Sequence, residues 1–301
     1  MRKKIIGIFV TTLFIATTII PLVSSLETST PTVVLSAGTL DQKQEITTNL
    51  EWLEGGADNW QEFIPTKALL SEVEVHIGCY YSGSYPVTLT IEMNLGMSPP
   101  ITTATLPCSA MPQNQQGWVM FDVVDRCLVP GAKYYIVLRF DPGSEYAWSG
   151  SPKNPYANGE SNVGSMWDYA FRTYTLPNNP PSIPTITGKA NGKAGNTYNY
   201  TFLSTDPEGD KISYYVKWGD GNTILWTPLQ ASGNPLYETH NWTLQGTYTI
   251  EAKAQDRYGC QSDWGTLTVS MPKNHVINTP FLNFLHNYPV LYQIIQRLLK
   301  I

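Results

Sequence analysis

The chain has 301 residues, of which 12% are aromatic and only 14% are charged, and its formal net charge is −5. This mildly acidic balance argues against nucleic acid as a partner, because a phosphate backbone requires clustered Lys and Arg side chains. A low charge content with 18 Tyr and 9 Trp is instead typical of a β-rich extracellular protein.

The N-terminus has the pattern of a secretory signal peptide. Three cationic residues at positions 2–4 precede an apolar run at 5–23, and Ser24 and Ser25 follow it. We therefore predict a signal peptide at 1–25 and a secreted or cell-surface protein, with an uncleaved anchor as the alternative. Removal of the three cations changes the formal net charge to −8. Asn199 and Asn241 begin Asn-x-Thr sequons that glycosylation enzymes outside the cytosol could use.

The four cysteines, Cys79, Cys108, Cys127 and Cys260, show no C-x-x-C spacing, which disfavours zinc and thioredoxin-like chemistry. Disulfides persist outside the cytosol. We predict a Cys108–Cys127 bond that closes a short segment, with the other pairings left open. Cys260 would then be a small core residue or a surface thiol.

Residues 38–175 alternate between apolar and polar side chains, as half-buried strands do. The expected inward positions include Val73 to Cys79, Val87 to Met93, Val119 to Val123 and Tyr134 to Phe140, taken every second residue. Turn sequences such as Pro130-Gly131 and Asp141-Pro142-Gly143 separate these runs. Short strands at near-regular spacing predict a β-sandwich of the jelly-roll kind.

A linker and a second strand-rich block follow. Residues 176–184, "LPNNPPSIP", hold four prolines and read as a semi-rigid spacer. Residues 185–272 contain further short alternating runs, such as "ISYYVKW" and "TYTIEAKA", which fit one immunoglobulin-like sandwich. The predicted fold class is thus all-β.

The second block resembles the PKD family of immunoglobulin-like modules from secreted and cell-surface proteins. The likeness rests on "YNYTFLSTDPEGDKISYYVKWGDG" at 198–221 and "THNWTLQGTYTIEAKAQDRYG" at 239–259. One departure is Val216, where the family usually has Trp. The resemblance implies that His240 is structural, and that calcium can bind near the acidic turn, as in some members.

The acidic turn has two interpretations. In "DPEGD", Pro207 and Gly209 supply turn geometry, and a carboxylate can accept hydrogen bonds from the turn backbone. Alternatively, Asp206, Glu208 and Asp210 could direct oxygens at one Ca²⁺, although this ion wants six to eight ligands. Calcium is the only cofactor that we consider.

The first block is similar to jelly-roll modules of secreted microbial proteins, which resemble discoidin-like and carbohydrate-binding folds. The segments that carry this likeness include "WQEFIPTKALLSEVEVHIG" and "GWVMFDVVDRCLVPGAKYYIVLRF". Tyr146, Trp148, Tyr156 and Trp167 form a candidate sugar-binding cluster, because flat aromatic rings beside polar groups suit a sugar. The alternative is that these rings pack inward and pin a long loop across the sheet end.

Residues 279–301 show helical periodicity. Leu291, Ile294, Ile295 and Leu298 fall on one face, opposite Gln293 and Arg297. The last twelve residues span only ~18 Å as a helix, which is too short to cross a bilayer. This amphipathic segment could dock on protein, lie in the membrane interface, or act as a sorting element.

No nucleophile elbow, zinc-protease motif or phosphate-binding loop is present in the sequence. We therefore expect a non-catalytic adhesion protein, in which a jelly-roll module recognises a cell-surface glycan or protein on a PKD spacer. The alternatives are a hydrolase or its accessory fragment, and a structural envelope protein.

Overall fold

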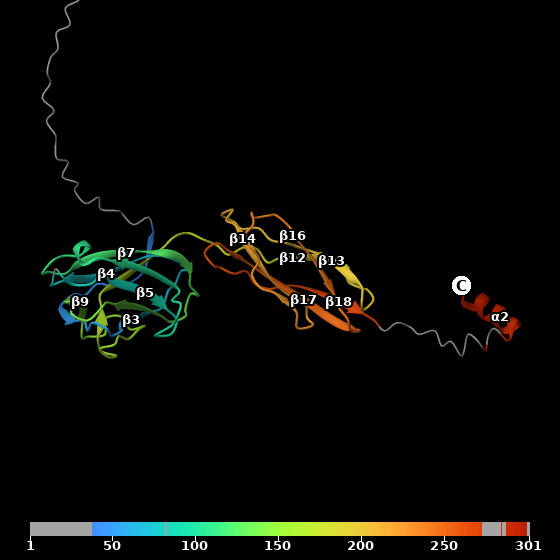
Figure 1. Cartoon of the computed structure of the whole chain (residues 1–301), viewed down its shortest axis with the longest axis horizontal. Coiled ribbons are helices and arrows are strands. Elements are labelled where there is room, and N and C mark those ends of the chain that lie inside the picture. Colours follow the sequence, from blue (N-terminus) through green and yellow to red (C-terminus); the bar gives the residue numbers. More distant parts are fainter. Residues whose placement is uncertain (1–37, 82, 273–283, 285–286, 300–301) are drawn as a thin grey trace, which may run out of the picture. The chain divides into compact units, whose positions relative to one another are not determined.

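The computed structural model describes residues 38–81, 83–272, 284 and 287–299. The predicted signal peptide at 1–25 lies outside these residues. The described chain is built almost entirely of antiparallel β-strands, as the alternation predicts (Figure 1). Within it, no helix combines the length and the hydropathy of a membrane span.

The first sandwich consists of two sheets. In the described part of the chain, one sheet has seven strands in the order β1-β11-β4-β9-β10, with β2 added on β9 and β7 on β4. The other has four strands in the order β3-β8-β5-β6. The strands are β1 Thr39–Gln44, β2 Asn49–Trp52, β3 Asn59–Phe63, β4 Leu69–Cys79, β5 Val87–Glu92, β6 Thr102–Leu106, β7 Gly117–Cys127, β8 Tyr134–Arg139, β9 Tyr146–Ser151, β10 Asp168–Tyr169 and β11 Phe171–Thr175, and a short 3-10 helix, η1, covers Cys108–Ala110.

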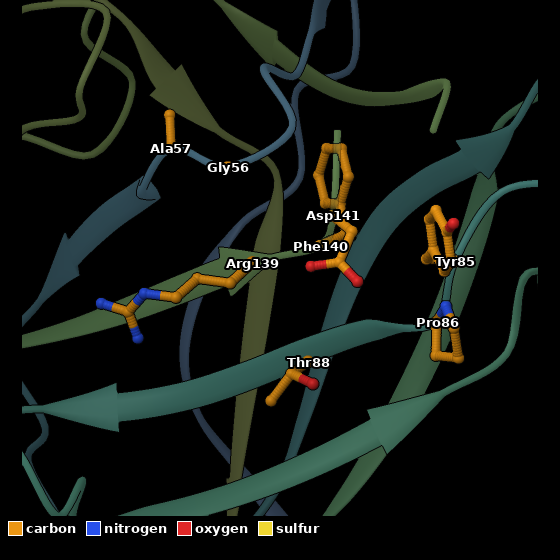
Figure 2. Close-up of a pocket in the computed structure, with 8 residues that line it drawn as sticks. All are labelled: Gly56, Ala57, Tyr85, Pro86, Thr88, Arg139, Phe140 and Asp141. Atoms are coloured by element: carbon orange, nitrogen blue, oxygen red, sulfur yellow. The ribbon is translucent and has the colours of Figure 1, made fainter. Parts of the chain in front are cut away.

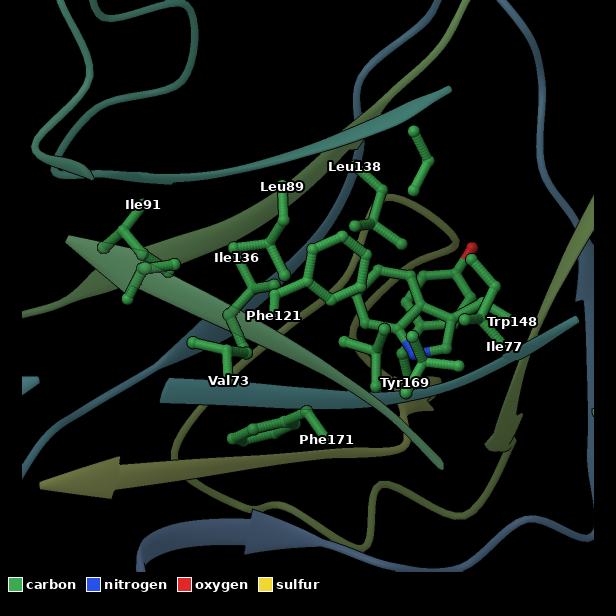
Figure 3. Close-up of a cluster of buried hydrophobic side chains, with 14 of the residues drawn as sticks. Val73, Ile77, Leu89, Ile91, Phe121, Ile136, Leu138, Trp148, Tyr169 and Phe171 are labelled. Atoms are coloured by element: carbon green, nitrogen blue, oxygen red, sulfur yellow. The ribbon is translucent and has the colours of Figure 1, made fainter. Parts of the chain in front are cut away.

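The inner faces of these sheets form one apolar core, part of which is drawn in Figure 3. Val73, Leu89, Phe121 and Ile136 come from four different strands, and each is fully buried. The alternation therefore predicts the inward faces of β4, β5, β7 and β8 correctly. Met93 is an exception, since it follows the end of β5 and is 45% exposed.

The second sandwich also has two sheets in the described residues, with the strand orders β12-β13-β16 and β15-β14-β17-β18. Strand β11 ends at Thr175 and β12 begins at Thr185, and the proline-rich segment runs between them. The strands are β12 Thr185–Gly188, β13 Thr197–Leu203, β14 Ile212–Lys217, β15 Thr223–Ile224, β16 Leu236–Asn241, β17 Gly246–Asp256 and β18 Gly265–Met271. Trp218 and Trp242 stand at the centre of a separate apolar core.

The disulfides differ from the prediction. Cys79 pairs with Cys108, and Cys127 pairs with Cys260, so the predicted Cys108–Cys127 bond is wrong and Cys260 is not a free thiol. Cys127 stands at the far end of the eleven-residue strand β7. At about 3.3 Å per residue, this strand carries Cys127 roughly 30 Å along the sheet from the end where Cys79 and Cys108 meet. The second bond links β7 to the turn after β17, where the Cys127 N–H also donates to the Tyr258 carbonyl at 3.0 Å.

Helix α2 spans Pro289–Leu299 and begins at the proline, which is the favoured first position of a helix. Leu291, Ile294 and Leu298 of the predicted apolar face are 40%, 49% and 76% exposed, and Ile295 is half-buried. Residues 279–283, where the predicted segment starts, lie outside the described residues. The described helix therefore presents most of its apolar face uncovered.

Candidate ligand-binding site

The predicted aromatic cluster does not form an exposed surface. Tyr146 and Trp148 lie on β9, all six residues of which are buried. The Trp148 ring stacks on Tyr169 at 4.2 Å, and its Nε1–H donates to the Ala170 carbonyl at 2.9 Å. Strand β9 pairs with β2, β4 and β10 along its edges, and the burial of all six of its residues shows that both of its faces are also covered. Contact of Tyr146 and Trp148 with a ligand is therefore a wrong prediction, and the packing alternative is correct for them.

Tyr156 and Trp167 belong to the loop between β9 and β10 and hold it in place. The Tyr156 hydroxyl donates to Gln42 Oε1 at 3.0 Å, and its backbone N–H donates to Asp168 Oδ2 at 2.9 Å. Burial raises the pKa of both the Tyr156 hydroxyl and the Asp168 carboxyl. Trp167 is half-buried with its ring edge toward Tyr169. These contacts fit the alternative in which the rings pin the loop.

A pocket of about 450 Å³ lies elsewhere on the first sandwich, beside the ends of β5 and β8 (Figure 2). Its lining residues are Gly56, Ala57, Tyr85, Pro86, Thr88, Arg139, Phe140 and Asp141. It combines an exposed aromatic ring with a guanidinium, a carboxylate and a hydroxyl. This mixture can stack on the apolar face of a sugar ring and bond its hydroxyl groups.

Tyr85 supplies the exposed aromatic ring of this pocket, and hydrogen bonds hold its backbone in place. Tyr85 is 53% exposed, yet both of its backbone groups are bonded. Its N–H donates to Ser144 Oγ at 2.9 Å, and its carbonyl accepts the Tyr146 hydroxyl at 2.7 Å. The buried Tyr146 therefore supports the pocket from behind. A backbone that is held before binding loses little conformational entropy when a ligand stacks on the ring that it carries.

The guanidinium of Arg139, which also lines the pocket, is held by hydrogen bonds. Arg139 makes bidentate contacts with Asp58 and with Glu92, and its Nη1–H also donates to Thr90 Oγ1 at 3.0 Å. Burial favours a higher pKa for Glu92, but the hydrogen bonds from Arg139 and Thr90 oppose it, and the net pKa is lowered. The two carboxylates in turn raise the pKa of Arg139. The five N–H groups of the guanidinium are thus committed to Asp58, Glu92 and Thr90, and two carboxylates balance its charge at the edge of the pocket.

We expect Arg139→Met to destabilise the fold by about 3 kcal/mol at pH 7, because it leaves the fully buried Glu92 without its cation. In the native protein the lowered pKa of Glu92 supplies stability that is present at neutral pH and lost as the pH falls through that pKa. In the variant, burial alone raises this pKa, so protonation relieves the cost. Urea unfolding should therefore show a smaller difference between the two proteins at pH 4 than at pH 7. Lys43→Met, which breaks the exposed pair with Glu45, is the control and should cost less than about 1 kcal/mol. An equal loss at both pH values would contradict the role given to Glu92.

Sequence reasoning missed this pocket, although a partial signal was present. The alternation on β5 and β8 turns Thr88, Glu92 and Arg139 away from the core. Their convergence depends on the β5–β8 register, which pairs Thr88 with Arg139. The contribution of Tyr85 depends on a loop conformation that no periodicity encodes.

Comparison with known proteins identifies the second sandwich. The family model described as "PKD domain" matches residues 178–271. A solved PKD domain of an M14-like peptidase from Thermoplasmatales archaeon SCGC AB-540-F20 is 52% identical over 32% of this chain and 100% of its own, with a TM-score of 0.32. The chain belongs to the PKD domain family. The PKD domain of the human receptor SorCS2 is 20% identical over 33% of this chain and 82% of its own, with a TM-score of 0.24.

The β-glucuronidase of Ruminococcus gnavus is 12% identical over 72% of this chain and 36% of its own, with a TM-score of 0.22. The chain thus spans about a third of the length of that enzyme. No curated protein matches the sequence.

The acidic turn of the PKD domain has the geometry of a capped turn. Asp206 is buried, and its Oδ1 accepts the N–H groups of Glu208 and Asp210 at 3.1 and 3.0 Å. Gly209 has a φ of 80°, as the turn requires. Burial raises the pKa of Asp206.

The predicted calcium ligands do not converge. The Glu208 carboxylate accepts two hydrogen bonds from Asn179, and Asp210 faces Arg257 at 4.0 Å. In the described part of the chain, no group of three or more His, Cys, Asp or Glu residues is placed to hold a metal ion. Turn geometry accounts for Oδ1 of Asp206, whereas its buried Oδ2 has no hydrogen-bond partner among the described residues, and calcium binding stays a prediction.

The remaining residues of the PKD motifs serve packing or lie at the surface. His240 stacks on Trp218 at 4.4 Å and contacts Asp220 Oδ2 at 2.8 Å, in keeping with a structural role. Asn199 on β13 and Asn241 on β16 are exposed, so both sequons are accessible. Their glycosylation stays a prediction.

Proposed function

We propose that this protein is an exported, non-catalytic recognition protein whose first sandwich binds a carbohydrate, with the PKD domain as its spacer. The observation that carries the proposal is the pocket beside Tyr85 and Arg139. It offers the exposed ring of Tyr85 for the face of a sugar, and the Asp141 carboxylate and the Thr88 hydroxyl for its hydroxyls. Two disulfides and a PKD domain support export, because disulfides persist outside the cytosol.

The carboxylates around the pocket support binding rather than catalysis. Asp141 is the one acidic residue among those that line it. Asp58 and Glu92, which lie behind, are both committed to Arg139. Glycoside cleavage normally uses two carboxylates that flank the bond, and this arrangement supplies one.

A second candidate function is that of an accessory region of an extracellular peptidase. The similar archaeal PKD domain, described as part of an M14-like peptidase, favours it. Peptide hydrolysis by the exported chain, or its purification as part of a larger peptidase, would favour this candidate over the first.

Helix α2 is the proposed attachment element. Residues 273–301 contain Lys273, Arg297 and Lys300 and no acidic residue, while most of the described apolar face of the helix is uncovered. A short cationic amphipathic helix suits the interface of an anionic membrane. The same features would also suit docking on a partner protein or a sorting contact.

We expect Tyr85→Ala to weaken glycan binding by at least about tenfold, since loss of a central aromatic contact typically has such an effect. Residues 26–301 would be screened on an array of plant and microbial glycans, and the affinity for the best glycan would then be measured by calorimetry. Tyr81→Ala is the matched control, because Tyr81 precedes the pocket in the same loop and is 52% exposed. The proposal fails if no glycan is retained, or if the Tyr85 and Tyr81 variants bind equally well.

A further inference from the structure

The PKD domain carries an aromatic cluster on the outer face of its four-stranded sheet. Tyr215 lies on β14, and its ring meets Trp226 and Trp264 edge to face at 5.6 and 5.8 Å. None of the three belongs to the buried core. Trp264 is 36% exposed, and the other two are half-buried. We call these three residues the aromatic face.

Two lysines lie against the aromatic face. Lys253 on β17 places its Nζ 5.0 Å from the centre of Trp264 and 5.4 Å from that of Trp226. Lys217 on β14 lies 4.2 Å above Trp264 and 3.4 Å from Glu251. Lys253 donates to the neutral Gln261, so its charge is not neutralised by that contact. Counted with Glu251, the two lysines leave one net positive charge beside the rings.

The aromatic face continues into a pocket of about 340 Å³. Trp226 lines this pocket together with Ser213 and Arg257. Ser213 is only 2% exposed, and among the described residues its hydroxyl has no hydrogen-bond partner. A buried hydroxyl without a partner is costly, and a polar ligand in the pocket could satisfy it. Arg257 is paired with Asp210 at 4.0 Å, and the buried Asp256 lines the same pocket.

We propose that this face of the PKD domain is a binding site for an acidic polysaccharide. Sugar rings would stack on Trp264 and Trp226, and a uronate carboxylate would pair with Lys253. The residues run from Trp264 along the sheet to the pocket beside Trp226, which suits a chain of several sugars. Charge complementarity favours an acidic ligand at the rings: residues 26–272 carry 13 Lys and Arg against 24 Asp and Glu, yet Lys217 and Lys253 both lie against Trp264.

This site is separate from the pocket beside Tyr85, so each can fail without the other. The probe is polygalacturonate, and its methyl-esterified form is the neutral comparison with the same backbone. Calorimetry at pH 7 should show that residues 26–301 bind polygalacturonate at least about tenfold more tightly than the esterified polymer at low salt, and that 0.5 M salt, roughly, removes most of this preference.

Two variants test the assignment. Trp264→Ala should weaken binding about tenfold, and Lys253→Gln, which can keep a bond to Gln261, should weaken it about threefold and reduce the salt dependence. Tyr237→Ala is the control, because this aromatic residue on β16 of the other sheet is 72% exposed. Circular dichroism would verify that each variant is folded.

The assignment is overturned by any of three results: no binding of polygalacturonate, equal binding of the esterified polymer, or unchanged binding by both variants. If Tyr85→Ala abolishes binding while Trp264→Ala does not, the acidic polymer belongs to the first sandwich. If Trp264→Ala weakens polygalacturonate binding and Tyr85→Ala leaves it unchanged, the site on the PKD domain stands on its own.

Discussion

Trp148→Ala should destabilise the first sandwich by about 3–5 kcal/mol, which is the range for truncation of a buried Trp. The side chain is fully buried, stacks on Tyr169 at 4.2 Å and donates to the Ala170 carbonyl. Truncation removes a large apolar volume and leaves that carbonyl without its buried donor. Denaturant unfolding followed by circular dichroism would measure the loss.

Trp52→Ala is the control for this prediction. Trp52 on β2 is 56% exposed, and its ring contacts Tyr80 edge to face at 4.8 Å. We expect its truncation to cost less than about 1 kcal/mol, because little of its surface leaves water on folding. Similar losses in the two variants would show that Trp148 is not a core residue. If Trp148→Ala shows the larger loss, as expected, any loss of glycan binding in this variant reflects folding and not a lost contact.

The inward faces of the strands could be predicted from sequence, because a strand that covers one core alternates strictly. Val73, Val75 and Ile77 on β4 are all buried as expected. The acidic turn was also predictable, since Pro207 and Gly209 specify its geometry locally. In both cases the information lies within a few residues.

Strand β9 shows where this reasoning stops. Its sequence, YAWSGS, contains polar residues and is typical of a strand with one solvent-exposed face. Both faces are nevertheless buried, and the Ser149 hydroxyl on the second face lies 2.8 Å from His76 Nδ1. His76 is 73 residues away in the sequence, so local alternation does not report this burial.

The candidate site depends on still longer separations. Arg139 meets Asp58 and Glu92, which are 81 and 47 residues away in sequence. Each of these residues alone looks like an ordinary exposed charge. Only the pairing of β3 with β8 and of β8 with β5 brings them together, and a single sequence does not specify this strand order.

The disulfides pose the same difficulty, since four cysteines allow three pairings and sequence alone does not choose between them. The prediction favoured the short Cys108–Cys127 loop. The structure instead joins Cys127 to Cys260 across 133 residues, because β7 runs the length of the sheet before it reaches Cys127. The first sandwich and the PKD domain are thus connected twice, by this bond and by the proline-rich segment.

Replacement of Cys127 and Cys260 by Ser should destabilise the PKD domain by up to about 4–5 kcal/mol in the loop-closure account of disulfides. While the first sandwich is folded, the bond and the proline-rich segment tether the unfolded PKD domain at both ends. Without the bond, the unfolded domain gains the entropy of a free chain. Hydrogen exchange with mass spectrometry would measure this, because it follows peptides of the two sandwiches separately.

The matched control is the double replacement of Cys79 and Cys108 by Ser, which opens a loop of 29 residues inside the first sandwich. It should lower the free energy of opening that hydrogen exchange reports for peptides of the first sandwich by about 3–4 kcal/mol. The free energy of opening of β14 and β17 in the PKD domain should stay unchanged. Replacement of Cys127 and Cys260 should show the opposite pattern, with the larger loss of protection in β14 and β17. Two results would contradict this prediction. One is that both replacements lower the protection of the same peptides, and the other is that loss of the Cys127–Cys260 bond leaves the protection of the PKD domain unchanged. In either case the bond does not restrict the unfolding of the PKD domain. If β14 and β17 lose the most protection, as expected, the Cys127–Cys260 bond stabilises the PKD domain, which carries the aromatic face, by limiting the conformational freedom of its unfolded chain.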